Sequence, residues 1–201
     1  MENKSSIKEE EGKLISEIKP VRYGILIGLL CLIFGIGWAF YLVLGHERIH
    51  KSLEKVTIEK LHHDTEESHQ HSAEDEKKQD IHENPVAELA HRRLVRGHLH
   101  AMGLGLVSIT VSLILAFTSA NDRLKTIVST LTGIGGFIYP IAWILMGYRT
   151  PSLGTDAAEA SVIVIAGPSV IFILIGIFTA IIFFVKDIFS RCRNYNTQVQ
   201  E

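Results

Sequence analysis

Four long apolar stretches constrain this chain more than any other feature. They cover residues 23–44, 99–120, 124–147 and 161–185. A helix needs roughly 20 apolar residues to cross a hydrocarbon core of about 30 Å. Among the last three stretches, Lys125 near the start of the third is the one Asp, Glu, Lys or Arg. The sequence therefore predicts an all-α integral membrane protein, folded as a four-helix bundle.

The segments between these stretches indicate that the first two helices continue outside the membrane. Leu53, Val56 and Leu61 follow the first stretch at helical spacing, and Asn84-Pro85 is typical of a helix start. Residues 64–83 are too polar to offset the entropy of ordering, so we expect a mobile tip. The predicted organisation begins with a cytoplasmic tail (1–22), a first span (23–44) and a His-rich extracytoplasmic helical hairpin (45–98). Three further spans (99–120, 124–147 and 161–185) and a second cytoplasmic tail (186–201) follow.

Orientation is less constrained, because basic residues are nearly balanced between the two sides. The long polar insert can translocate regardless of its charge, and the short loop at 148–160 carries only Arg149 as a basic residue. We therefore expect both termini in the cytoplasm of a bacterial inner membrane, with the hairpin outside.

Several function classes are disfavoured by composition. The formal net charge is −2, and no basic face is interleaved with aromatic residues, so we expect no nucleic-acid partner. The apolar stretches carry no ionisable residue at midplane depth, as an ion path would require. No nucleophile with a base, no paired acids and no phosphate-binding glycine loop is visible. A pump or a hydrolase is therefore not expected, and we predict no catalytic residues.

Histidines next to the membrane are the candidate chemistry. His46 and His50 are four residues apart where the first span ends, so on one helix they share a face. His91 and His98 are seven apart on the returning helix and also share a face. Because exit and re-entry lie on one side of the membrane, these pairs can converge, and imidazoles bind zinc, copper, iron and nickel. The sequence predicts His46 and His98 at nearly the same height.

The alternative is that interfacial histidines only extend toward water, as amphipathic side chains do. The remaining histidines of the insert sit among carboxylates and could collect metal ions loosely or serve only as polar surface: His62, His63, His69, His71 and His82.

His98 and His100 lie at the entry to the second span, in the stretch from Val95 to Gly105. Two residues apart on a helix means nearly opposite faces, so we expect one of them, His100, to point into the bundle. An imidazole at that depth needs a partner or a ligand.

His98-x-His100-x-x-x-Leu104-Gly105 resembles the H-x-H-x-x-x-L-G entry helix of small four-helix bacterial membrane proteins that look like fragments of the heme–copper oxidase subunit I fold. The resemblance covers the second to fourth spans, and it implies heme or copper ligation by His98 and His100. The chain departs from that pattern in its last span, where Pro168-Ser169-Val170 stands in place of a histidine.

These observations favour a non-enzymatic membrane protein whose candidate ligands bind a transition metal (copper, zinc or iron) or heme, as an accessory to a respiratory or metal-handling system: His46, His50, His91, His98 and His100. One alternative is a structural subunit that assembles through glycine-lined faces such as Gly24-x-x-x-Gly28, with other membrane subunits or as a homo-oligomer. Another is a small-solute permease, carried by the glycines and prolines of the third and fourth spans.

Overall fold

A computed structural model describes residues 2–67 and 85–198 of the chain. Within those residues the regular structure is entirely helical, which confirms the predicted all-α class. The elements are α1 (Glu2–Ile18), the 3₁₀ helix η1 (Lys19–Val21), α2 (Arg22–Leu44), α3 (His46–Glu67), α4 (Pro85–Ala116), α5 (Asp122–Leu153), α6 (Thr155–Ala160) and α7 (Ile163–Gln198).

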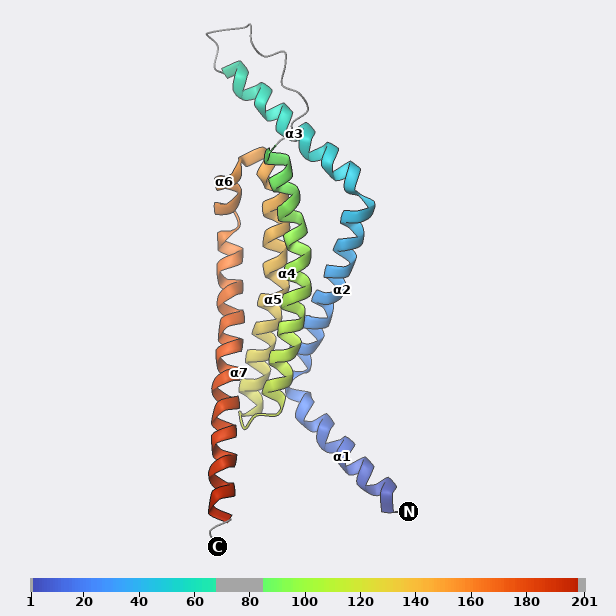
Figure 1. Cartoon of the computed structure of the whole chain (residues 1–201), viewed down its shortest axis with the longest axis vertical. Helices are drawn as coiled ribbons and strands as arrows, with labels where there is room; N and C mark the ends of the chain where they lie inside the picture. Colours follow the sequence, from blue (N-terminus) through green and yellow to red (C-terminus); the bar gives the residue numbers. More distant parts are fainter. Residues whose placement is uncertain (1, 68–84, 199–201) are drawn as a thin grey trace.

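Four helices in the described part of the chain are long and apolar enough to cross a membrane: Glu10–Leu44, which contains α2, then α4, α5 and the Ile163–Ser190 part of α7. They lie side by side, with both chain ends at one end of the bundle and α3 and α6 at the other (Figure 1). The end that carries α3 and α6 is called the outer end below.

Helix α5 is the centre of the bundle, because α4, α2 and α7 all pack against it. In the most apolar stretch of α5, 50% of the residues are buried inside the chain, whereas only 22% are buried in the corresponding stretches of α2 and α7. Asn121 fixes its start, since the side-chain oxygen of Asn121 accepts a hydrogen bond from the Leu124 backbone N–H at 2.8 Å. The outer faces of α2 and α7 are therefore apolar and exposed, as helices that face lipid would be.

Small residues bring the helix backbones close together. A side chain on Gly105 of α4 would begin 2.9 Å from the Gly28 carbonyl oxygen of α2, which leaves no room for it. Such small-residue contacts are typical of helix pairs in membranes. Gly24, Gly28 and Gly35 approach other helices of this same chain, as expected of small residues on the first span, whereas the expectation fails for Gly37, which has no neighbouring helix within 4 Å of its Cβ position among the described residues.

The connection between α4 and α5 is held by polar contacts at the opposite end of the bundle, called the inner end below. Lys125 is only 7% exposed, and its Nζ donates to the Ala116 carbonyl oxygen at 2.8 Å, at the carboxyl end of α4. Exposed last-turn carbonyls of a helix are well satisfied by such a cation. The charge that interrupts the third apolar stretch therefore caps the neighbouring helix.

Helix α3 departs from the predicted hairpin. The helix path is interrupted at Gly45, and α3 then slants across the outer ends of α4 and α5 instead of running along α4 (Figure 1). It continues to Glu67, past Asp64 where we expected the polar tip to begin. The remainder of that predicted tip, 68–83, lies outside the described residues.

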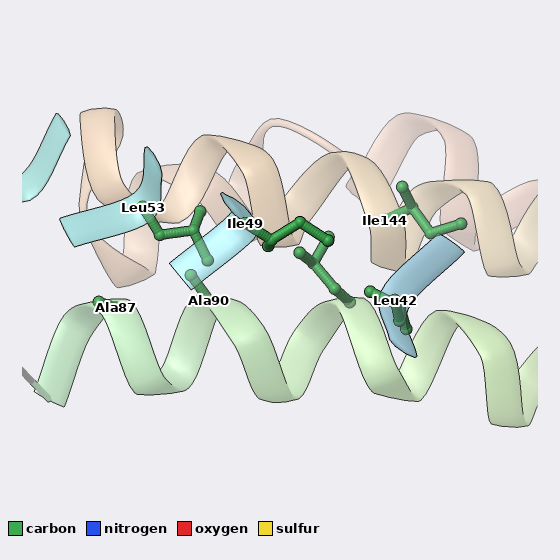
Figure 2. Packing of buried hydrophobic residues seen from close by; sticks show 7 residues of the cluster. Leu42, Ile49, Leu53, Ala87, Ala90 and Ile144 are labelled. Carbon is green, nitrogen blue, oxygen red and sulfur yellow. The ribbon is translucent and has the colours of Figure 1, made fainter. Parts of the chain in front are cut away.

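Apolar side chains explain why α3 lies across the bundle. Ile49 and Leu53 of α3 point into the space between α4 and α5, next to Ala90 and Ile144 (Figure 2). Thr57 continues the same buried stripe at the same four-residue spacing. The hydrophobic periodicity after the first span therefore correctly predicted a helix. This helix packs against α5 as well as against α4, the one partner that we expected.

Replacing Leu53 with alanine is expected to loosen α3 from the bundle. Leu53 is 5% exposed, and truncating a buried leucine costs about 2–5 kcal/mol. Amide hydrogen exchange of α3 should accelerate, with little change in α5. Val56→Ala on the exposed side of the same helix (38% exposed) is the matched control. Equal acceleration in both variants would contradict this packing of α3.

Candidate functional site

Three of the predicted histidines meet at the outer end of the bundle. His46 and His50 lie on the first turns of α3, and His91 lies near the start of α4. The ring centroids of His46 and His91 are 5.2 Å apart, nearly perpendicular, and those of His46 and His50 are 6.2 Å apart. We call these three residues the histidine triad.

The local sequence explains this arrangement. Helix α2 ends at Leu44, the backbone N–H of Gly45 donates to the Tyr41 carbonyl oxygen, and α3 begins directly at His46. Ile49 is buried against α4 and α5. His46 and His50 lie three residues before it and one residue after it on α3, and both therefore lie on the side of α3 that faces α4. On α4, the buried residues Ala87, Ala90 and Leu94 face α3 and α5, and His91 lies beside them.

The polar atoms of His91 are incompletely satisfied. Its Nδ1 is buried and has no hydrogen-bond partner among the described residues. A buried polar atom without a partner costs about 1–3 kcal/mol, so such atoms usually serve a ligand or an ordered water. His46 is exposed and His50 is half-buried. The triad therefore joins one imidazole with a buried nitrogen to two that are at least partly accessible to solvent.

The spacing of the rings is compatible with ligands of one metal ion. With Zn–N bonds of about 2.0 Å, the ring centroids of two imidazoles on a tetrahedral ion lie roughly 5 Å apart. The His46–His91 distance of 5.2 Å fits this value, and the His46–His50 distance of 6.2 Å is longer. Over the described part of the chain, no group of three or more His, Cys, Asp or Glu side chains is already arranged to hold a metal ion. Metal binding would require the His50 side chain to rotate inward.

The predicted height of His98 is wrong. His98 is seven residues beyond His91 on α4, roughly 10 Å deeper at 1.5 Å per residue. Its Nδ1 donates to the Gly35 carbonyl oxygen of α2 at 2.8 Å. His46 instead meets His91, because α3 turns across the bundle at Gly45 and brings its first turn over the outer part of α4.

His100 points toward α5, as expected, but His98 also contacts a neighbouring helix, although only one of the two was expected to face inward. The His100 ring lies 5.1 Å from that of Tyr139 and 5.2 Å from that of Trp143, both on α5. His98 and His100 thus contact different helices, α2 and α5. They do not face a common space, so they do not fit as two axial ligands of one heme. His62 and His63 lie on α3, and His69, His71 and His82 fall outside the described residues.

Sequence reasoning missed Arg93. This residue is only 5% exposed, and its guanidinium Nη1 donates to Thr150 Oγ1 at 2.8 Å. Its Nη2 lies 3.7 Å from a carboxylate oxygen of Glu159. A signal was present, because Arg93 shares a four-residue spacing with Gly97, Ala101 and Gly105, all of them buried on α4.

Comparison with protein-family models, with curated proteins and with solved structures returns no significant match. The resemblance to oxidase-related four-helix proteins therefore stays a prediction, and the site is judged on its own geometry.

Proposed function

We propose that this chain is a non-enzymatic membrane protein that binds one transition-metal ion, zinc, copper or iron, through His46, His50 and His91. The observation that carries the proposal is the buried Nδ1 of His91, which lacks a hydrogen-bond partner among the described residues while the His46 ring packs against its own ring. Imidazole nitrogens are common ligands of these metals. The exposed position of His46 gives ions from the outer solution a path to the site.

The wider role that we propose is an accessory to a respiratory or metal-handling system. A shallow site at the membrane surface suits transient loading and release, because it is neither enclosed by protein nor remote from solvent. Heme ligation by His98 and His100 would require both side chains to leave their contacts with Gly35 and with Tyr139 and Trp143. We therefore assign the metal to the triad.

A structural subunit without a cofactor is the second candidate function. It is favoured by the finding that His98 and His100 both serve the packing of helices. The glycines first expected to face partner subunits support it less, since Gly24, Gly28 and Gly35 are buried against α4 and α5. The permease alternative rests on glycines of α5 and α7, and Gly135 and Gly176 hold these two helices in close contact.

Zinc binding by the triad is expected to depend on pH. Imidazole binds a metal only in its neutral form, so protons compete with zinc for the ring nitrogens. Zinc occupancy should therefore be highest at the alkaline end of the titrated range and fall as the solution is acidified. Isothermal titration from pH 5 to 8 measures this, with the five other histidines of the insert replaced by glutamine: His62, His63, His69, His71 and His82. We call this background the five-glutamine variant, and absence of zinc binding at pH 8 would favour the structural candidate.

We further propose that both termini lie in the cytoplasm of a bacterial inner membrane, with the triad outside. Ser152 at the outer end and Asp122 at the inner end are both exposed, so each can carry a reporter cysteine in a Cys192→Ser background. A membrane-impermeant maleimide added to spheroplasts should label the Ser152→Cys chain and spare the Asp122→Cys chain. The reverse pattern would invert the proposed orientation.

A further inference from the structure

A second site lies on the opposite side of α4 from the triad. A cavity of about 370 Å³ opens between α4, α5 and the α6–α7 connection. Its polar lining comes from Arg93, Arg96 and Glu159, and its apolar lining includes Trp143 and Ala166. This volume is at the lower end of the range for small-ligand sites, about 300–1,000 Å³.

The charges in this cavity favour an anion. Two guanidinium groups and one carboxylate line it, which leaves an excess of one positive charge. Arg93 is held in place by Thr150 and by a 3.4 Å contact from its Nη1 to the Thr155 carbonyl oxygen. Glu159 is 70% exposed, so its 3.7 Å pairing with Arg93 is weakened by water. An incoming phosphate can therefore compete with Glu159 for the guanidinium.

Arg96 adds a second, accessible cation. Its guanidinium lies 5.4 Å from the centroid of the Trp143 ring, which supports it in a cation–π contact while the side chain stays exposed. Arginine binds phosphate oxygens in a fork of two N–H donors. Arg93 and Arg96 are three residues apart on α4, so they face the cavity from successive turns.

Apart from Tyr139, the rest of the lining is apolar, and it continues onto the apolar helix α7. Ala142 of α5 and Val162 beside α7 are buried in the wall, and Ile163 is 65% exposed toward the surroundings of the bundle. The polar residues lie near the outer end, and Ala166 continues the lining along α7 into the apolar span. Basic pockets between membrane helices on the cytoplasmic side bind anionic lipid headgroups, and the same pairing of guanidinium with phosphate can operate at the outer end.

From this geometry we propose that the cavity binds an anionic glycerophospholipid. Its phosphate pairs with Arg96 and Arg93, and its acyl chains follow the apolar wall between α5 and α7. The cavity has room for the headgroup and the first part of the chains, while the remainder of the lipid lies in the bilayer.

Trp143 offers a local reporter, because the chain has two tryptophans and Trp38→Phe leaves Trp143 alone. The Trp38→Phe chain in dodecyl maltoside is titrated with dihexanoyl phosphatidylglycerol, with dihexanoyl phosphatidylcholine and with inorganic phosphate. The fluorescence of Trp143 should change saturably with phosphatidylglycerol and stay constant with the other two. An equal response to phosphatidylcholine would overturn the proposal, and so would a saturable response to phosphate alone, which indicates a site for soluble anions.

Arg96→Gln should raise the midpoint of the phosphatidylglycerol titration about tenfold, the effect of losing one charged hydrogen-bonding group. Arg92→Gln is the matched control, since Arg92 is exposed, pairs with Glu88 and does not line the cavity. Native mass spectrometry of the chain with both tryptophans, counting retained phosphatidylglycerol, gives the same comparison without the Trp38 substitution. Equal midpoints and equal retention in the two arginine variants would contradict the assignment of Arg96.

Discussion

His91→Ala is expected to abolish zinc binding by the triad, with a loss of affinity of at least about 100-fold, because even residues that only orient a ligand are worth about 10–100-fold. The imidazole of His91 is the one member whose Nδ1 is buried without a hydrogen-bond partner among the described residues. Without it, His46 and His50 are two ligands on one helix, and their ring centroids are 6.2 Å apart. Isothermal titration in the five-glutamine variant measures the loss.

His98→Ala is the control for this experiment, because it removes an imidazole from the same helix at a site bonded to Gly35. Its zinc affinity should match that of the five-glutamine variant. Circular dichroism of both variants should show unchanged helix content, since His91 is not part of the closely packed core. If His98→Ala removes zinc binding and His91→Ala retains it, the metal belongs to the membrane entry site that the sequence resemblance implies.

Gly135→Ala is expected to destabilise the bundle by about 1–2 kcal/mol. The new Cβ would lie 2.5 Å from the Ser169 carbonyl oxygen, a backbone atom of α7, so α5 and α7 must separate. Overpacking costs about 1–3 kcal/mol, and a contact this close to a backbone atom belongs to the upper half of that range; the better helix propensity of alanine recovers about 1 kcal/mol. The thermal midpoint in detergent should fall by several degrees, at about 2–4 °C per kcal/mol.

Gly103→Ala tests the reason for that loss. Gly103 lies on an exposed face of α4, and apart from its own stretch of helix no described atom lies within 4 Å of the position of its Cβ. The same chemical change should therefore leave the midpoint unchanged or raise it slightly through helix propensity. A drop equal to that of Gly135→Ala would mean that close contact between α5 and α7 is not what Gly135 provides.

The four long apolar helices could be predicted from the sequence because lipid imposes length and hydrophobicity directly, whereas α6 lies in a segment that we expected to be a loop. A stretch such as 161–185 has one solution in a bilayer, a helix. The helical state of α4 at Pro85 also agrees with the sequence, since proline is favoured in the first helical turn. These features depend on local residues and need no knowledge of neighbours.

The meeting of His46 with His91 could not be predicted, because it depends on the direction of α3. Straight continuation of α2 would bring His46 level with His98, as we expected. Instead, the helix is interrupted at Gly45, and Ile49 and Leu53 are buried across α4 and α5. His46 is therefore level with His91. A glycine at the end of a span signals a break, but the angle of the break is set by tertiary packing.

The arginine cavity was missed for a related reason. The four-residue spacing of Arg93 with Gly97, Ala101 and Gly105 places it on the buried face of α4, apart from its exposed neighbour Arg92, but this spacing does not identify the partner of Arg93. Arg93 is buried because Thr150, near the carboxyl end of α5, accepts a hydrogen bond from its guanidinium. Residues 57 positions apart in sequence have no common local pattern.

Zinc-edge X-ray absorption on the five-glutamine variant, loaded at pH 8 with one zinc per chain, tests the central claim most directly. The account predicts scattering from three imidazole rings with Zn–N distances of about 2.0 Å, completed by one light atom from water. The same measurement on a His46→Ala/His91→Ala chain should lose that pattern. A shell of oxygen atoms without imidazole scattering, or an unchanged spectrum in the double variant, would contradict metal binding by the triad.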